Sequence, residues 1–385
     1  MASHMKNVLI TGGAGFIGSH TADLLINQGY HVRILDMLDP QIHNTSGSFP
    51  QYLSPQIEKI KGDVRSLSDL KVALKDIDYV YHFAALTGVG QSMYDISHYT
   101  DINVTGTATL IEAIIRTKTP IKKLVLASSR AVYGEGSHAC PEHGITYPKM
   151  REAKQLAQGE FGLFCQQCQQ AMQSVATAED RTLNPGSIYA LTKLQQEHYC
   201  QYATETFDIP TCILRYFNVY GSRQSLHNPY TGVMTVFYNR IKAGNPVSLY
   251  ENGLPGRDFV HISDVAQANV LALQKPATAD TIEHYNVGTG QEVSIKDVAL
   301  AVGQACGKTP DLLDQGEYRV GDIKSCYANI DRIKNSLGFS PQVNLLDGVS
   351  EFVRWADQQS CSDNYEQTVA ELKAFGLFGS SREPG

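Results

Sequence analysis

Long apolar runs are missing from this 385-residue sequence. No segment reaches the roughly 18 consecutive apolar residues that a membrane-spanning helix needs. Cysteine is scarce: eight residues are too few for a disulfide scaffold in a chain of this length. No charged segment followed by an apolar one, as in a secretory signal, opens the sequence. We therefore expect no membrane association and a reducing, cytoplasmic location.

A strong excess of one charge is also missing. Lys and Arg number 32 against 39 Asp and Glu, so no overall field attracts nucleic acid or an anionic membrane. With 42% hydrophobic and 18% charged residues, the composition is typical of a globular chain with a large core. The length favours roughly two or three domains. Residues 1–4 resemble the remnant of an expression tag.

A glycine-rich turn is the first motif present. It separates a strand predicted over residues 8–10 from a helix predicted over residues 19–29, and it contains Gly12, Gly15 and Gly18. Gly12 permits a tight turn, Gly15 lets the backbone approach a pyrophosphate, and Gly18 lets the helix pack on the sheet. Free N–H groups at the start of the helix would bind the phosphates. An ordinary strand–helix turn is the alternative.

An acidic residue follows the second predicted strand. This strand covers residues 31–35 and ends at Asp36, eighteen residues after Gly18. A carboxylate at this place can accept hydrogen bonds from both ribose hydroxyls and repels a 2′-phosphate. Met37 follows it, where an enzyme specific for NADP often has Arg. The pattern predicts a dinucleotide site that prefers NAD over NADP.

Strands and helices continue to alternate after this unit. Strands are predicted over residues 57–60, 78–83 and 123–127, and helices over residues 67–74 and 102–117. The alternation predicts an α/β fold with a doubly wound parallel sheet, in which ligands bind beyond the carboxyl ends of the strands. Those ends are Gly12, Asp36, Asp63, Ala84 and Ser128. Asp63 could reach an adenine amino group, or it could simply stabilise a turn.

Hydroxyl groups and a lysine form the second motif. The strand over residues 123–127 ends at Ser128 and Ser129, and Tyr189 precedes Lys193 by four residues on a predicted helix. Side chains at this spacing share one helix face. We expect Lys193 to lower the pKa of the Tyr189 phenol. The phenolate could then remove the proton of a substrate alcohol as hydride leaves the same carbon.

Eight segments together resemble a known family. In order they are TGGAGFIG, HFAAL, LASSRAVYG, YALTK, RYFNVYGSRQ, RDFVHISDVA, NVGTG and RVGDI. They are similar to the nucleotide-sugar epimerase/dehydratase branch of the extended short-chain dehydrogenase/reductase superfamily. The resemblance implies a Rossmann domain, a smaller α/β C-terminal substrate domain, tightly held NAD and a homodimer. We expect an NAD-binding domain over residues 6–215, a nucleotide-sugar domain mainly over 216–360 with some return to the first domain, and a flexible tail over 361–385.

The resemblance also implies roles for individual residues. It makes Tyr189 the catalytic base, assisted by Ser129 and Lys193. The expected cofactor contacts are Gly12, Gly15, Phe16, Ile17, Gly18, Asp36, Asp63, Val64, Ala84, Ala85, Tyr189 and Lys193. The expected contacts to a dTDP- or UDP-sugar are Val89, Ser129, Asn218, Arg257, Arg319 and Asp322, with both arginines on the diphosphate.

Two positions discriminate between the reactions of this branch. Related dehydratases carry Asp-Glu directly after the catalytic hydroxyl residue, and sugar-acid decarboxylases carry a Glu one residue further on. Here these positions hold Arg130 and Ala131. The missing carboxylates favour C4 epimerisation through a transient 4-keto sugar. A 4-keto-sugar reductase and a catalytically silent NAD-binding regulator are the alternatives.

A long insertion contains a possible metal site. Fifty-five residues separate Tyr133 from Tyr189, far more than simple sugar epimerases have, and the insertion covers residues 135–185 approximately. It contains Cys140 with His143 and Cys165 with Cys168, two closely spaced ligand pairs of the kind that hold structural zinc. The alternative is a set of free or redox-active thiols.

The insertion also bears on the substrate. Together with NPGSIYALTK, RYFNVYGSRQSLHNPYTGV and YRVGDIKSCYANI, it resembles the bacterial 4-epimerases that convert dTDP-L-rhamnose to dTDP-6-deoxy-L-talose for surface polysaccharides. Epimerisation of UDP-glucose or UDP-glucuronate is the alternative, because thymine and uracil differ by a single methyl group. A buried methyl contributes only about 1 kcal/mol.

Overall fold

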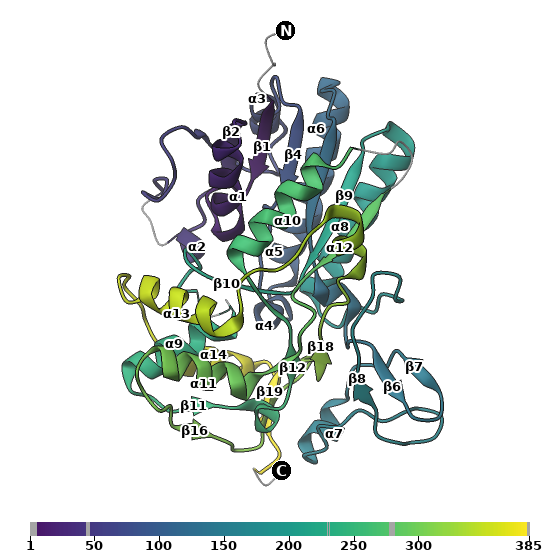
Figure 1. Ribbon diagram of the computed structural model, residues 1–385, viewed down its shortest axis with the longest axis vertical. Coiled ribbons are helices and arrows are strands. Elements are labelled where there is room, and N and C mark those ends of the chain that lie inside the picture. Colours follow the sequence, from purple (N-terminus) through teal and green to yellow (C-terminus); the bar gives the residue numbers. More distant parts are fainter. Residues whose placement is uncertain (1–5, 44–46, 229, 231, 277–281, 383–385) are drawn as a thin grey trace.

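A seven-stranded parallel sheet forms the centre of the computed structural model, with helices on both faces (Figure 1). The structure describes residues 6–43, 47–228, 230, 232–276 and 282–382, so the residues resembling a tag lie outside it. From edge to edge the strands are β14 (Glu283–Val287), β9 (Thr211–Tyr216), β5 (Lys123–Ser129), β4 (Tyr79–His82), β1 (Asn7–Thr11), β2 (His31–Asp36) and β3 (Glu58–Lys61). Every neighbouring pair is parallel, which confirms the predicted doubly wound α/β sheet.

Side chains on the two faces of this sheet belong to two separate hydrophobic cores. In β1, Val8 and Ile10 face one core and Leu9 faces the other, as the two-residue period of a strand requires. The first core is covered by α1 (Phe16–Asn27), α10 (Ile262–Gln274) and α12 (Asp331–Leu337). The second is covered by α3 (Leu67–Ala73), α6 (Gly106–Thr117) and α8 (Ile188–Phe207).

The order of the strands creates the ligand crevice. β1 lies between β2 and β4, so the chain winds outward from β1 in both directions. Ligands bind at such a reversal, beyond the carboxyl ends of the strands. The loops there carry the short helices α2 (Pro40–His43), α4 (Val89–Ser92) and α5 (Ile96–Thr100). The helix predicted over 102–117 is divided, because a π-helical turn, η1 (Asp101–Thr105), precedes α6.

A second, smaller core holds the rest of the chain together. The helices α9 (Val233–Ala243), α11 (Ile295–Ala305) and α13 (Leu345–Ala356) pack around it. The short strand pairs beside it are β10 (Asn218–Tyr220) with β13 (Phe259–His261), and β11 (Val247–Ser248) with β16 (Leu312–Leu313). A further sheet contains β15 (Val293–Ser294), β12 (Gly256–Arg257) and β18 (Ser325–Cys326), and the turn η3 (Tyr250–Gly253) lies nearby. After β13 the chain returns to the large sheet as α10 and β14.

The insertion forms a separate lobe, which Figure 1 shows at the lower right, beside β18. After the turn η2 (Arg130–Tyr133), it folds into β6 (His138–Cys140), β7 (Gly144–Thr146), α7 (Ala153–Ala157) and β8 (Gln173–Ser174). The three strands form one antiparallel sheet in the order β7-β6-β8. No helix in the described part of the chain is long and apolar enough to cross a membrane.

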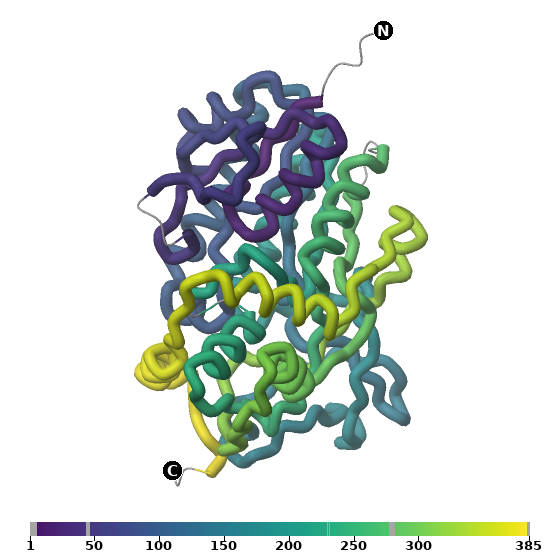
Figure 2. The backbone as a smooth tube through the Cα atoms, turned by 60° about the vertical axis from the view of Figure 1, so that its left-hand side comes forward, coloured from purple at the N-terminus to yellow at the C-terminus, as the bar shows by residue number. Residues whose placement is uncertain are grey.

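The segment after residue 360 differs from the flexible tail that its polar composition predicts. It forms α14 (Tyr365–Ala374) and β19 (Phe378–Ser380), and β19 pairs antiparallel with β17 (Glu317–Arg319). Figure 2 shows this yellow segment lying along the part of the chain that is built around the smaller core. Three of its apolar side chains, Val369, Leu372 and Phe378, are buried in one cluster. Burial of these few side chains and the strand pairing hold the segment in place.

A buried ion pair connects α8 to the sheet. The guanidinium of Arg215 donates to both carboxylate oxygens of Glu197 at 2.9 and 2.8 Å, and each side chain is only 3% exposed. We predict that Glu197→Ala lowers the free energy of unfolding by about 3–5 kcal/mol, because a buried cation loses its partner. Urea denaturation of both proteins measures the difference. The exposed helix pair of Glu112 and Arg116 supplies the control, since Glu112→Ala should cost less than about 1 kcal/mol. Equal losses in the two variants would contradict the prediction.

Candidate active site

The glycine turn connects β1 to α1 in a conformation that larger residues cannot adopt. Gly12 has a φ of +69°, and a Cβ on it would lie 2.7 Å from the backbone nitrogen of Ala84. A Cβ on Gly18 would lie 2.5 Å from the carbonyl oxygen of Gly12. The helix begins at Phe16, earlier than predicted, and no side chain caps its first N–H groups. These groups therefore remain available to an anion.

A cavity of about 350 Å³ opens in front of this turn. With one exception, every cofactor contact expected from the sequence lines it. The lining residues of that set are Gly12, Gly15, Phe16, Ile17, Gly18, Asp36, Val64, Ala84, Ala85, Tyr189 and Lys193. The combination of a free helix N-terminus, a buried acid and a glycine cradle fits a dinucleotide such as NAD.

The two acids expected to contact the cofactor differ, since only Asp36 lines the cavity. Asp36 is buried at the end of β2, where its carboxylate accepts from the backbone N–H groups of Ala14 at 3.0 Å and Leu38 at 2.9 Å. Asp63 is the exception named above. Its carboxylate accepts from both the backbone and the guanidinium of Arg65, and this hydrogen bonding lowers its pKa against the effect of burial. The structure therefore favours the turn-stabilising alternative for Asp63.

Two elements bring the predicted catalytic side chains together. Ser129 ends β5, while Tyr189 and Lys193 lie one turn apart at the start of α8, which Ser187 caps by accepting from Ala190 N–H at 3.1 Å. The Ser129 hydroxyl lies close enough to the Tyr189 phenol to lower its pKa. The Ser129 oxygen also accepts from the Ala131 N–H at 3.1 Å.

Lys193 lies beside the phenol without reaching it. Its Nζ is 6.0 Å from the centroid of the Tyr189 ring and donates to the Ala127 carbonyl at 3.0 Å. Burial lowers the pKa of Lys193 to about 7. Burial likewise raises the pKa of Tyr189, whereas the Ser129 hydrogen bond and the charge of Arg130 lower it. The pKa of Tyr189 is raised overall, so the lowering that we expected from Lys193 remains a prediction, and Arg130 is a further cation that acts on the phenol.

A second cavity, of about 280 Å³, adjoins the first, since Tyr230 and Gly232 line both. The expected substrate residues that line it are Val89, Asn218, Arg257, Arg319 and Asp322. Ser129 lines neither cavity and contacts the site through Tyr189. Asn218 places its side-chain oxygen in a buried position with no donor among the described residues.

Two arginines of the second cavity differ in whether a carboxylate forms an ion pair with them. Arg319 forms an ion pair with Asp322 at 2.8 Å. Arg257 is 6% exposed and donates to the carbonyls of Gly256 and Ile323, each at 2.8 Å. Burial and the charge of Arg130 lower the pKa of Arg257 to about 10. Within the described residues Arg257 forms no direct ion pair, although the charges of Asp322, Glu135 and Glu251 raise its pKa, so its guanidinium can still pair with an anionic ligand.

One wall of this cavity was not expected from the sequence. Asn364, Tyr365, Thr368 and Leu372, all in or next to α14, line it. β19 also holds the strand of Arg319, because Phe378 pairs directly with Arg319. The apolar spacing of Val369 and Leu372 was a signal of a packed helix face, but the many polar neighbours masked it.

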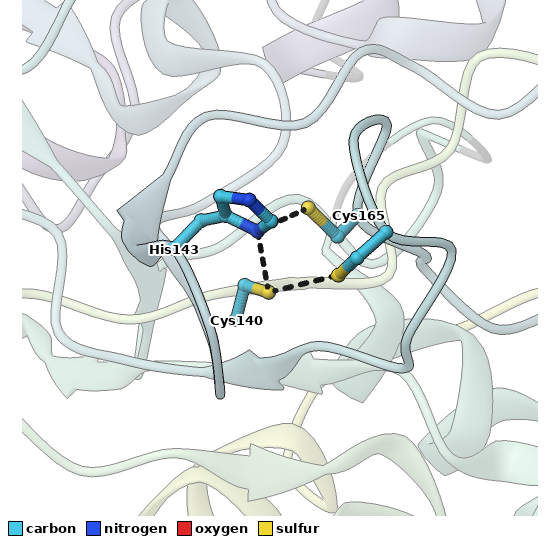
Figure 3. Close-up of side chains that lie close together, drawn as sticks. Cys140, His143 and Cys165 are labelled. Atoms are coloured by element: carbon cyan, nitrogen blue, oxygen red, sulfur yellow. Dashed lines mark hydrogen bonds between the residues drawn. The ribbon is translucent and has the colours of Figure 1, made fainter.

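The insertion brings its four predicted metal ligands together. The ligand atoms of Cys140, His143, Cys165 and Cys168 all lie within 4.8 Å of one another. Figure 3 shows Cys140 and Cys165 pointing toward the His143 ring, and each sulfur lies 3.5 Å from its Nδ1. None of the four residues lines either cavity.

Comparisons with known proteins agree with this geometry. Residues 8–153 and 165–288 match the NAD dependent epimerase/dehydratase family. The chain is 35% identical over 359 residues to a dTDP-L-rhamnose 4-epimerase of Burkholderia thailandensis, covering 92% of this chain and 96% of that protein. It is 31% identical over 350 residues to a putative UDP-glucose 4-epimerase of Methanocaldococcus jannaschii, covering 90% and 97%.

A solved structure shows the same likeness. The UDP-glucuronic acid 4-epimerase of Bacillus cereus, in complex with UDP-glucuronic acid and NAD, superposes with a TM-score of 0.74 at 29% identity. The alignment covers 91% of this chain and 99% of that one. The similarity therefore extends over the large sheet, the part of the chain around the smaller core, and both cavities.

The lowered pKa of Lys193 predicts how stability depends on pH. Between about pH 7 and the pKa of an unfolded lysine, about 10.4, the unfolded chain binds a proton that the folded chain does not. Stability should therefore rise with pH across this window, and Lys193→Met should reduce the slope. Urea denaturation at several pH values measures it, with the exposed lysine variant Lys71→Met of α3 as control. The same slope in wild type and Lys193→Met would contradict a lowered pKa.

Proposed function

This chain belongs to the NAD dependent epimerase/dehydratase family, and we propose that it inverts C4 of a nucleotide-diphosphate sugar by way of a transient 4-keto sugar. One observation carries the proposal. The neighbouring hydroxyls of Ser129 and Tyr189 are next to a cavity that fits NAD, and a cavity lined by the buried guanidinium of Arg257 adjoins it. Relatives similar along the whole chain are NAD-dependent 4-epimerases, so an isomerase with bound NAD is the expected activity.

Acid–base chemistry in this proposal belongs to Tyr189. Its phenolate removes the proton of the sugar's C4 hydroxyl, and the Ser129 hydroxyl stabilises the phenolate through its hydrogen bond. The glycine turn and Asp36 would hold NAD, which when bound supplies the hydride acceptor and donor at C4. Tyr189 later returns the proton to the C4 oxygen, so the enzyme ends the cycle in its starting state.

The residues beside Ser129 limit the reaction to this step. Arg130 lines the second cavity, and Ala131 is buried in η2, so neither position supplies a carboxylate. Elimination of water from the 4-keto sugar would need an acid and a base there, and decarboxylation would need a Glu. The absence of both supports epimerisation over the other reactions of the family.

Arg257 is the group we assign to the substrate diphosphate. Its guanidinium is held by backbone carbonyls alone, and Arg130 adds a second positive charge nearby. A diphosphate would supply the missing negative charge through charge-assisted hydrogen bonds. Anchoring the diphosphate leaves the sugar free to present either face to the cofactor.

We propose dTDP-L-rhamnose as the substrate, with dTDP-6-deoxy-L-talose as product. The Burkholderia thailandensis relative supports this choice, and UDP-glucose is the second candidate because of the Methanocaldococcus jannaschii relative. Purified enzyme incubated with a panel of dTDP- and UDP-sugars should convert dTDP-L-rhamnose with the highest kcat/KM, without a net change in NADH absorbance. NMR of the products identifies the inverted carbon. A higher kcat/KM for a UDP-sugar would reassign the substrate but keep the reaction.

A homodimer is part of the proposal, because the family resemblance implies pairing through the helices that follow Asn103 and Tyr189. The side chains of Leu191 and Tyr202 on α8 are 51% and 59% exposed, which leaves apolar surface on that helix for a second copy.

Tyr189→Phe tests the assigned base. The ring remains and the cavity keeps its shape, so bound NAD should be retained, while turnover should fall by about 10²–10⁴-fold because no group accepts the C4 proton. Kinetics and the NAD content of the purified protein measure the two effects. Tyr199→Phe on the same helix is the control and should keep turnover near wild type. A near-normal rate for Tyr189→Phe would remove Tyr189 from this role.

A further inference from the structure

The Cys/His cluster of the insertion has no part in the proposed reaction. The fold nevertheless holds its four ligand atoms within 4.8 Å of one another. We propose that Cys140, His143, Cys165 and Cys168 bind one structural Zn²⁺, and that this metal keeps the insertion folded as a brace behind the substrate cavity. The metal site stands on its own geometry. The bracing role rests in addition on the proposed function.

The spacing of the ligand atoms fits tetrahedral zinc. Sulfur and nitrogen atoms bound tetrahedrally at about 2.0–2.3 Å from a zinc ion lie roughly 3.5–3.8 Å apart. Here Cys140 Sγ lies 3.5 Å from Cys168 Sγ, and His143 Nδ1 lies 3.5 Å from the sulfurs of both Cys140 and Cys165. Three thiolates and one imidazole form a closed four-ligand set, which is typical of structural rather than catalytic zinc.

Two tight turns present these ligands in pairs. Cys140 and His143 lie on the turn between β6 and β7, which closes at Gly144 with a φ of +68°. Cys165 and Cys168 lie on a second turn, where the Gln169 N–H donates to the Cys165 carbonyl at 2.8 Å.

The insertion has little else to hold it together. Its strands β6, β7 and β8 are only three, three and two residues long. One apolar cluster of the lobe, Leu156 with Phe161, packs on Tyr318 of the main body. A metal therefore supplies folding free energy that the small core lacks.

The lobe meets the main body through buried polar contacts. The Arg151 guanidinium donates to the carbonyl of Asp322 at 3.0 Å and pairs with Glu251 and Glu135. The Glu135 carboxylate accepts from the Lys324 N–H at 2.7 Å. Arg151, Glu135 and Glu251 are all at most 5% exposed, so these contacts are fixed in the core.

The same segment positions the substrate cations. Arg257 donates to the carbonyls of Ile323 at 2.8 Å and Lys324 at 3.3 Å, and Arg319 pairs with Asp322. Residues 322–324 therefore contact the insertion on one side and the cavity arginines on the other. Loss of the metal should loosen this segment and weaken diphosphate binding, while the glycine turn on β1 and α1 stays intact.

Metal analysis of the full-length protein tests the site directly. Protein produced with zinc in the medium and dialysed against buffer should contain about one zinc per chain. Cys165→Ser/Cys168→Ser should contain almost none, and the control Cys306→Ser/Cys361→Ser, at cysteines outside the cluster, should keep it. Wild type reconstituted with Co²⁺ should show the absorption of a tetrahedral thiolate site even if the cluster variant fails to fold. Folded wild type that takes up neither metal, or that carries a Cys140–Cys168 disulfide, would overturn the site.

Chelation of wild-type protein tests the brace. Removing the zinc should expose the insertion to limited proteolysis and raise KM for the nucleotide sugar about tenfold, with kcat and bound NAD nearly unchanged. Unaltered substrate affinity after complete zinc loss would overturn the brace while keeping the metal site. Because metal content and the Co²⁺ spectrum need no substrate, a protein that binds zinc but converts no sugar would refute the proposed function and leave the site standing.

Discussion

The close approach of the Ser129 hydroxyl to the Tyr189 phenol is the contact on which the candidate site depends. It joins the end of β5 to the start of α8, two elements that come from distant parts of the sequence. Beneath it, the buried pair of Glu197 and Arg215 fixes the same helix to the sheet, and Ser128 adds a hydrogen bond to Glu197 at 2.5 Å. The fold itself therefore holds the Ser129 and Tyr189 hydroxyls next to each other, without any contact from the substrate.

Several Arg and Lys side chains are buried in this structure. Some buried cations, such as Arg215 and Arg151, are paired with carboxylates within the fold. Arg257 is held only by carbonyl dipoles, and Lys193 is buried beside the hydroxyls with a lowered pKa. Unpaired buried charge is costly. Among the described residues, Lys123 and Arg181 are also buried without an ion pair and donate to backbone carbonyls away from the cavities, whereas Lys193 and Arg257 line cavities that a ligand can fill.

Much of this site was predictable because its signals are local. Gly12 and Gly18 are required by backbone geometry, and the spacing of Tyr189 and Lys193 follows from one helical turn. The effect of Arg130 on Tyr189 was not predictable, since it depends on how a loop folds back over the sheet. The wall formed by α14 was missed for a related reason, because its few apolar residues gain meaning only when the partner surface is known.

The pairing of β19 with β17 has a consequence for biosynthesis. Residues 365–380 are translated after every other element of the substrate cavity, and they complete its wall and back the strand of Arg319. On the ribosome the large sheet and its cores are complete only after β14 and α12 have been made, and residues 365–380 follow later still. The wall that α14 forms is therefore the last part of the substrate cavity that a nascent chain can add.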